Sequence, residues 1–270
     1  MKKTILLTGA TDGIGLEAAR RLARDGHRLL LHGRNAAKLS KVVAEVSGLP
    51  NAGPVDSYVA DLSALEDVEA MATAVVEAHE RLDVLINNAG VFKVPDATTP
   101  SGIDLRFMVN TIAPYLLTRR LLPHMDATGR VVNLSSAAQS PVDAQAMAGR
   151  AHLSEFEAYA QSKLAITMWS RQLADELGEQ GPVIVAVNPG SMLGTKMVKE
   201  GFGVAGNDVG IGAEILVRAA LAEEFAGASG RYFDNDAQRF AQPHPDALEP
   251  SKNAALVAAL DAVLSRTANE

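Results

Sequence analysis

Short apolar runs alternate with segments of helical spacing through almost the whole chain, and this alternation most constrains the fold. The apolar runs have the length and composition of strands buried on both faces. They span residues 4–8, 28–31, 55–60, 83–86, 130–136, 183–187 and 230–233. The helical segments span 16–24, 36–47, 64–79, 102–123, 158–177, 209–223 and 253–265. The pattern predicts an α/β fold: a doubly wound parallel sheet of about seven strands with helices on both faces.

Size and composition indicate one globular domain spanning residues 1–270. The chain has 270 residues and no internal repeat, which suits a single large core. Its 47% apolar and 21% charged residues are close to globular averages. A net charge of −7 argues against a nucleic-acid partner. Cysteine is absent and the six histidines lack metal-ligand spacing, so we expect neither a disulfide nor a metal site.

No stretch of the sequence has the pattern of a membrane segment. No window approaches about 18 uninterrupted apolar residues. Met1–Thr4 leads directly into the first strand without an apolar leader. We therefore expect a cytoplasmic protein that does not bind membranes.

A glycine-rich turn lies between the first strand and the first helix, with the sequence Thr8-Gly-Ala-Thr-Asp-Gly-Ile-Gly15. Glycines let backbone N–H groups approach a pyrophosphate at the positive end of the helix. The order of strand, glycine turn and helix favours the dinucleotide site of a Rossmann fold over a tight turn without a ligand. The expected contacts are Gly9, Thr11, Asp12, Gly13, Ile14 and Gly15.

The end of the second strand bears on which dinucleotide binds. Enzymes that prefer NAD usually place a carboxylate here for the ribose 2′-hydroxyl. Gly33 stands where that acid is expected, and Arg34 offers a charge that suits a 2′-phosphate. The alternative is a solvated arginine at a helix start. We predict NADP rather than NAD, with Arg34 and Asn35 at the phosphate.

Tyr159 and Lys163 stand four residues apart in a helical segment, so both side chains project from one face. A nearby ammonium favours the phenolate and moves the phenol toward acid/base work. The strand that ends at Ser136 could bring a hydroxyl to the same point. Alone, this spacing is more often a packed ring with a solvated lysine. Together, the three groups suit proton transfer to a carbonyl or alcohol oxygen.

Amide side chains mark two further positions. Asn87-Asn88-Ala89-Gly90 follows a strand, where parallel sheets bind ligands, although Asn87 is expected only to tie neighbouring strands together. Asn110 lies in an apolar helical segment, where asparagine is unfavourable, so it should have a specific partner.

With these pieces placed, the chain resembles the short-chain dehydrogenase/reductase family over almost its whole length. The motifs that carry the resemblance are Thr8-Gly9-x3-Gly13-x-Gly15, Asp61-Leu62, Asn87-Asn-Ala-Gly90, Asn110, Ser136, Tyr159-x3-Lys163 and Asn188-Pro-Gly190. The resemblance implies that Tyr159 donates the proton and Ser136 holds the substrate oxygen. It implies that Lys163 grips the nicotinamide ribose and lowers the pKa of Tyr159, and that Asn110 anchors a relay water.

The same resemblance implies the remaining cofactor contacts. Asp61 and Leu62 would lie beside adenine. Asn88, Ala89, Gly90, Tyr159, Lys163, Pro189, Gly190 and Thr195 would lie near the nicotinamide end. The gap between Ser136 and Tyr159 is longer than in many members, as in the branch with retinol dehydrogenases, WW-domain oxidoreductases and protochlorophyllide reductases. The choice of Ser136 over Ser135 rests on alignment alone.

We expect an oxidoreductase that interconverts a carbonyl and an alcohol with NADP(H). Two alternatives stay open: an NADPH-dependent C=C reductase, and a dinucleotide-binding regulator without turnover. Residues 137–157, an insertion, and 191–207, a glycine-rich loop, should shape the pocket for a small-molecule substrate. Apolar side chains there favour an apolar substrate: Phe156, Met192, Leu193, Met197 and Phe202. Homo-oligomerisation, common in the family, stays open because the insertion could obstruct it.

Overall fold

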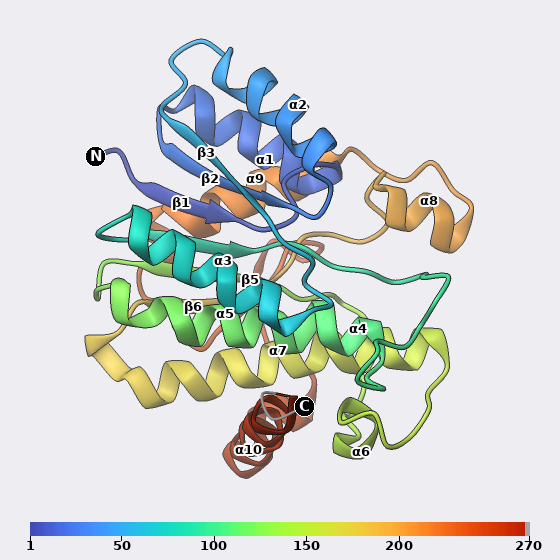
Figure 1. The fold of residues 1–270 in the computed structure, drawn as a ribbon. Coiled ribbons are helices and arrows are strands. Elements are labelled where there is room, and N and C mark those ends of the chain that lie inside the picture. Colours follow the sequence, from blue (N-terminus) through green and yellow to red (C-terminus); the bar gives the residue numbers. More distant parts are fainter. Residues whose placement is uncertain (268–270) are drawn as a thin grey trace.

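The computed structural model describes residues 1–267, apart from the side chain of Phe202. One twisted sheet runs through the molecule in the order β3-β2-β1-β4-β5-β6-β7-β8 (Figure 1). Its strands are β1 (Thr4–Leu7), β2 (Arg28–Gly33), β3 (Val55–Val59), β4 (Val84–Asn87), β5 (Arg130–Leu134), β6 (Val183–Asn188), β7 (Tyr232–Asp234) and β8 (Arg239–Ala241). Every neighbouring pair is parallel except β7 and β8. The predicted doubly wound parallel sheet is confirmed.

The sheet has eight strands rather than about seven, because β8 pairs antiparallel with β7 at one edge. β8 is three residues long, too short for a periodic signal in the sequence. Phe240 in this strand packs edge-on against Phe233 and Phe225. The hairpin is thus fixed by an aromatic cluster that only the folded chain brings together.

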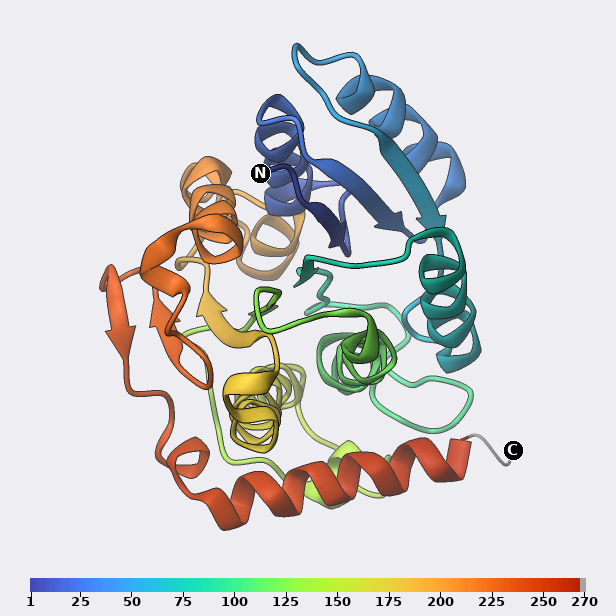
Figure 2. The same cartoon turned by 90° about the vertical axis from the view of Figure 1, so that its left-hand side faces the viewer.

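Helices cover both faces of the sheet, as predicted. One face carries α1 (Gly13–Arg24), α2 (Ala36–Ser47) and α9 (Val209–Leu221). The other carries α3 (Leu65–Ala78), α5 (Ala113–Leu121) and α7 (Glu155–Leu177), with α10 (Pro250–Thr267) lying across the outer side of α7 (Figure 2). The short helices are α4 (Leu105–Phe107), α6 (Ala144–Met147) and α8 (Lys196–Phe202).

β1 shows why the strands read as continuous apolar runs. Its side chains alternate between the two cores: Leu6 points to the α3/α5/α7 side, whereas Ile5 and Leu7 point to the α1/α2/α9 side. All three are fully buried. A strand covered on both faces has no position for a solvated side chain, and its carboxyl end becomes the natural place for polar groups.

The helix predicted over 102–123 is interrupted. α4 passes into a π-helical turn, Met108–Ile112, before α5 begins at Ala113. The turn is centred on Asn110, whose side chain bonds to a neighbouring segment rather than to solvent. Such turns inside helices occur frequently at functional sites.

Helix α7 begins at Glu155, earlier than predicted. Ser154 and Glu157 form a capping box: each side chain bonds to the other residue's backbone N–H. The pattern Ser-x-x-Glu is visible in the sequence and would have placed this start correctly. Tyr159 therefore lies in the second turn of α7, close to an N-terminus that the capping box stabilises.

Candidate active site

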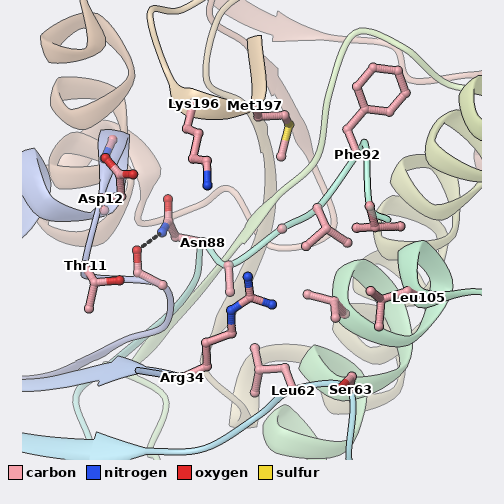
Figure 3. A pocket seen from close by; sticks show the side chains of 18 of the residues that line it. Thr11, Asp12, Arg34, Leu62, Ser63, Asn88, Phe92, Leu105, Lys196 and Met197 are labelled. Carbon is pink, nitrogen blue, oxygen red and sulfur yellow. Dashed lines mark hydrogen bonds between the residues drawn. The ribbon is translucent and has the colours of Figure 1, made fainter. Parts of the chain in front are cut away.

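A cleft of about 850 Å³ opens at the carboxyl edge of the sheet. It runs over the ends of β1, β2, β4 and β5, and residues of α8 line one side of it (Figure 3). Every residue predicted to contact the dinucleotide lines it except Gly190. Of the other predicted catalytic residues, Ser136 and Asn110 lie just outside its lining.

The glycine turn brings α1 closer to the sheet than any side chain would allow. A Cβ on Gly15 would lie 2.2 Å from the carbonyl oxygen of Gly9 and 2.5 Å from Asn88 Nδ2. Asn88 Nδ2 in turn donates to the carbonyls of Thr8 (2.8 Å) and Gly9 (3.0 Å). The start of α1 is thereby held over the cleft. This is the cradle that a pyrophosphate needs.

His32, which was not among the predicted site residues, holds the glycine turn in place through a hydrogen bond from Gly9. Its Nδ1 accepts from the backbone N–H of Gly9 (3.2 Å), so Nε2 carries the proton that bonds to the Ala60 carbonyl (3.0 Å). Burial lowers the pKa of His32, which keeps the ring in this neutral form. The sequence did contain a signal for this role: a histidine within an apolar strand is buried and therefore needs hydrogen-bond partners.

Arg34 reaches into the cleft from the end of β2, and Lys196 reaches in from α8 on the opposite side (Figure 3). Among residues 1–267, no hydrogen bond or ion pair engages the Arg34 guanidinium. Burial acts to raise the pKa of Asp61, but hydrogen bonds from Ser63 and the charge of Arg34 bring it below its usual value. The Asn35 side chain caps α2 by accepting from Lys38 N–H (2.9 Å).

Tyr159 and Lys163 line the cleft, and Ser136, just outside the lining, hydrogen-bonds to Tyr159. The Lys163 ammonium lies 5.8 Å from the centre of the Tyr159 ring and donates to the carbonyl of Leu134 (2.8 Å). Burial raises the pKa of Tyr159, and a hydrogen bond with Ser136 partly opposes this. The net shift is upward because burial has the larger effect, and the lowering of this pKa by Lys163 stays a prediction. The phenol is therefore in its protonated form near neutral pH.

The structure separates the two serines. Ser135 lines the cleft, but its hydroxyl is engaged by α7: it bonds to the carbonyl of Lys163 (2.9 Å) and to Thr167 Oγ1 (2.7 Å). The Ser136 side chain instead hydrogen-bonds to Tyr159. Of the two hydroxyls, the one that meets the phenol is therefore that of Ser136. The geometry favours Ser136.

Both asparagine expectations agree with the geometry. Asn87 ties strands together by donating to Asn133 Oδ1 (2.8 Å) and Thr118 Oγ1 (3.1 Å). Asn110 exchanges two hydrogen bonds with the backbone of Val91 and donates to Ser162 Oγ (3.0 Å). Its side chain thus locks the segment after β4 onto α7, one residue before Lys163.

The cleft wall departs from the expected loops. No residue of 137–157 lines it in the described chain; residues 91–96 and 98–100, after β4, take that place. The 191–207 loop contributes Thr195, Lys196, Met197 and Glu200. The other apolar residues expected at the pocket are outside the lining: Phe156 and Met192 are exposed, and Leu193 is buried. The Phe202 side chain lies outside the described structure.

Residues 3–202 match the sequence model of the short chain dehydrogenase family. The chain belongs to this family. It is 32% identical to human retinol dehydrogenase 13 over 271 residues, covering 91% of this chain and 79% of the relative, which confirms the predicted branch. Members are oxidoreductases acting on alcohols and carbonyls with NAD(P).

Two solved structures support the fold and the cofactor class. A protein from Mycobacterium paratuberculosis superposes with a TM-score of 0.80 at 26% identity, covering 97% of this chain and 92% of its own. A short chain dehydrogenase from Shigella flexneri 2a, solved with NADP, gives 0.68 at 29% identity, covering 87% of this chain and 97% of its own. The glycine cradle and the unpaired Arg34 fit a dinucleotide of this kind.

No helix within residues 1–267 is both long and apolar enough to cross a membrane. Over the same residues, no group of three or more histidine or acidic side chains could hold a metal ion. The cytoplasmic location stays a prediction, and oligomerisation stays open.

Replacing Gly15 with alanine should abolish the close approach of α1. Its Cβ would meet backbone, which cannot yield, so we expect a loss of roughly 1–3 kcal/mol in unfolding free energy and at least about tenfold weaker NADPH binding. Urea unfolding and fluorescence titration measure the two effects. Gly227→Ala is the matched control, because a Cβ there meets nothing within 4 Å. NADPH affinity equal to wild type in Gly15→Ala would contradict the cradle.

Lys163 should make stability depend on pH. Burial lowers its pKa from 10.5 to about 8, so between these values the unfolded chain binds more protons than the folded one. Unfolding free energy therefore rises with pH across this window. Relative to Lys163→Met, wild type should gain roughly 3 kcal/mol between about pH 7 and pH 11. Lys41→Met, at an exposed site on α2, should show no such trend; a parallel trend would refute the assignment.

Proposed function

We propose that this protein interconverts a carbonyl and an alcohol on a small apolar substrate, using NADP(H) and Tyr159 as general acid/base. The observation that carries this proposal is that Tyr159 and Lys163 line a glycine-cradled cleft, with Ser136 hydrogen-bonded to Tyr159 just outside its lining. A binder without turnover has no need of a buried phenol paired with a serine hydroxyl.

When bound, the dinucleotide supplies or accepts the hydride at the substrate carbon. In the reduction direction, the protonated Tyr159 hydroxyl donates its proton to the carbonyl oxygen. The Ser136 hydroxyl, whose oxygen accepts from Ala138 N–H (3.1 Å), would donate to the same substrate oxygen in place of its hydrogen bond with Tyr159. Lys163, almost fully buried, holds positive charge beside the phenol. Oxidation reverses the proton transfer.

The cleft wall supports an apolar substrate. Phe92 lies with its ring 5.0 Å from the Tyr159 ring, and Val94, Pro95 and Met197 continue the wall. α8 is held against this wall: a Cβ on Gly201 would come within 2.9 Å of the Phe92 ring. An apolar molecule whose carbonyl reaches Tyr159 would desolvate the reacting oxygen and strengthen its hydrogen bonds.

Tyr159→Phe should remove turnover while leaving NADPH affinity nearly unchanged, because the phenol oxygen acts on substrate. Retention of more than about a tenth of the wild-type rate would mean a loss below roughly 1.4 kcal/mol and would refute the general-acid role. NADPH oxidation should be followed over ketones, aldehydes, quinones and enones. Turnover of enones alone would identify a C=C reductase, and turnover of none of them would favour a regulator.

Arg34→Ala should weaken NADPH about 10- to 100-fold at low salt, because it removes a charge-assisted contact to the 2′-phosphate. NADH, which lacks that phosphate, should be affected little. Lys41→Ala removes an equal charge outside the cleft and serves as the control. Titration with both cofactors checks this. Equal weakening of NADPH and NADH would sink the assignment to NADP.

Inverting the preference needs more than an acid at Gly33. A Cβ there would lie 2.5 Å from Thr11 Cγ2, so Gly33→Asp alone introduces a clash. Adding Thr11→Ser removes that methyl group and keeps the hydroxyl. In the Arg34→Ala background, this pair should favour NADH by attraction to the ribose hydroxyl and repulsion of phosphate.

A further inference from the structure

The carbonyl of Ser136 has no partner within the sheet. β5 ends at Leu134, and Ser135 makes the last ladder contact, from its N–H to the Val187 carbonyl (2.8 Å). One residue later, the chain leaves the sheet with its carbonyl pointing into the protein. This half-buried carbonyl takes its donors from outside the sheet.

Two side chains supply them. The Tyr232 hydroxyl donates to Ser136 O (3.1 Å), and Gln139 Nε2 donates to the same oxygen (2.9 Å). Gln139 also accepts from His244 N–H (2.9 Å), which ties it to the C-terminal segment. Two side chains therefore hold the backbone carbonyl of Ser136, while its hydroxyl meets Tyr159.

Tyr232 is suited to this task. It lies in β7, only 5% exposed, on a sheet edge fixed by the aromatic cluster of β8. Burial, with Asp234 and Asp236 nearby, raises the pKa of Tyr232 well above its usual value. The phenol therefore remains a donor at any pH at which the protein works.

The hairpin of β7 and β8, which carries Tyr232, also holds the turn after β6. Asn188, at the end of β6, donates to Asp234 Oδ1 and Asp236 Oδ2 (2.9 Å each). Asp236 accepts from Ser191 N–H (2.8 Å). The turn that contains Pro189 and Gly190 is thus pinned to residues 232–241, called here the C-terminal hairpin, which lies beyond the family match at 202.

We infer that Tyr232 is a positioning residue for the reaction, holding Ser136 so that its hydroxyl meets the substrate oxygen beside Tyr159. This rests on the proposed function of Ser136. Tyr232 does not line the cleft, so its effect passes through the Ser136 peptide. Loss of its hydroxyl leaves that carbonyl with Gln139 alone.

The test is a double-mutant cycle between Tyr232→Phe and Ser136→Ala, with NADPH and the best carbonyl of the substrate panel. Tyr232→Phe should lower kcat about three- to tenfold with KM and NADPH affinity unchanged, since one hydrogen bond is lost. In the Ser136→Ala background it should have no further effect on kcat. Gln139→Met, which removes the second donor, should lower kcat in the same direction.

Tyr115→Phe is the matched control. Tyr115 is fully buried and donates to Asp261 (2.8 Å) between α5 and α10, away from the cleft. It should lower Tm without changing kcat. An equal loss of kcat in this control, or the same Tyr232→Phe factor with and without Ser136, would overturn the inference.

The outcomes also separate this inference from the proposed function. If Ser136→Ala is nearly inactive but Tyr232→Phe is fully active, the serine keeps its role and only the positioning inference falls. If Ser136→Ala is fully active, the proposed role of the serine fails and the inference falls with it.

Discussion

Buried amides at the carboxyl ends of adjacent strands hold the site together. Asn87, Asn133 and Asn188 lie at the ends of β4, β5 and β6, where the strand ladder runs out. Asn87 bonds to Asn133, which donates to Ser170 on α7 (2.8 Å). The set is bonded strand to strand and strand to helix, and of its side-chain oxygens Asn87 Oδ1 alone is buried without a hydrogen-bond partner in the described structure. Ser136 follows β5 directly, and Lys163 donates to the Leu134 carbonyl at the end of that strand.

Lys163 is a buried charge that these strand ends have to accommodate. An ammonium that is 4% exposed loses most of its hydration, which lowers its pKa to about 8. Only the Leu134 carbonyl, at the end of β5, is within hydrogen-bond distance among the described groups. A buried charge with so little compensation is tolerated where the rest of the structure is stable enough to carry it. Its position beside the Tyr159 ring gives that cost a function.

Local patterns in the sequence predicted most of the fold and the candidate site. The glycine turn and the Tyr159/Lys163 spacing depend only on neighbours along the chain, so they could be found without a structure. The grip of Tyr232 on Ser136 joins residues 96 apart, and nothing in either segment indicates the other. β8 and the wall formed by 91–100 were missed for the same reason. His32 was missed because a histidine in a strand has many explanations until its partners are known.

The molecule separates the parts that hold the reacting groups from the parts that meet the substrate. Tyr159 is carried by α7, whereas Ser136 follows β5 and is held through its backbone carbonyl by Tyr232 of the C-terminal hairpin and by Gln139. The wall is formed by the segment after β4 and by α8, which end in loops outside the sheet. Substitutions in that wall can change which molecule fits without moving the proton donor. Loss of the Tyr232 hydroxyl, which does not line the cleft, changes the support of Ser136 without altering the cleft wall, so the two kinds of change should appear separately, in KM and in kcat.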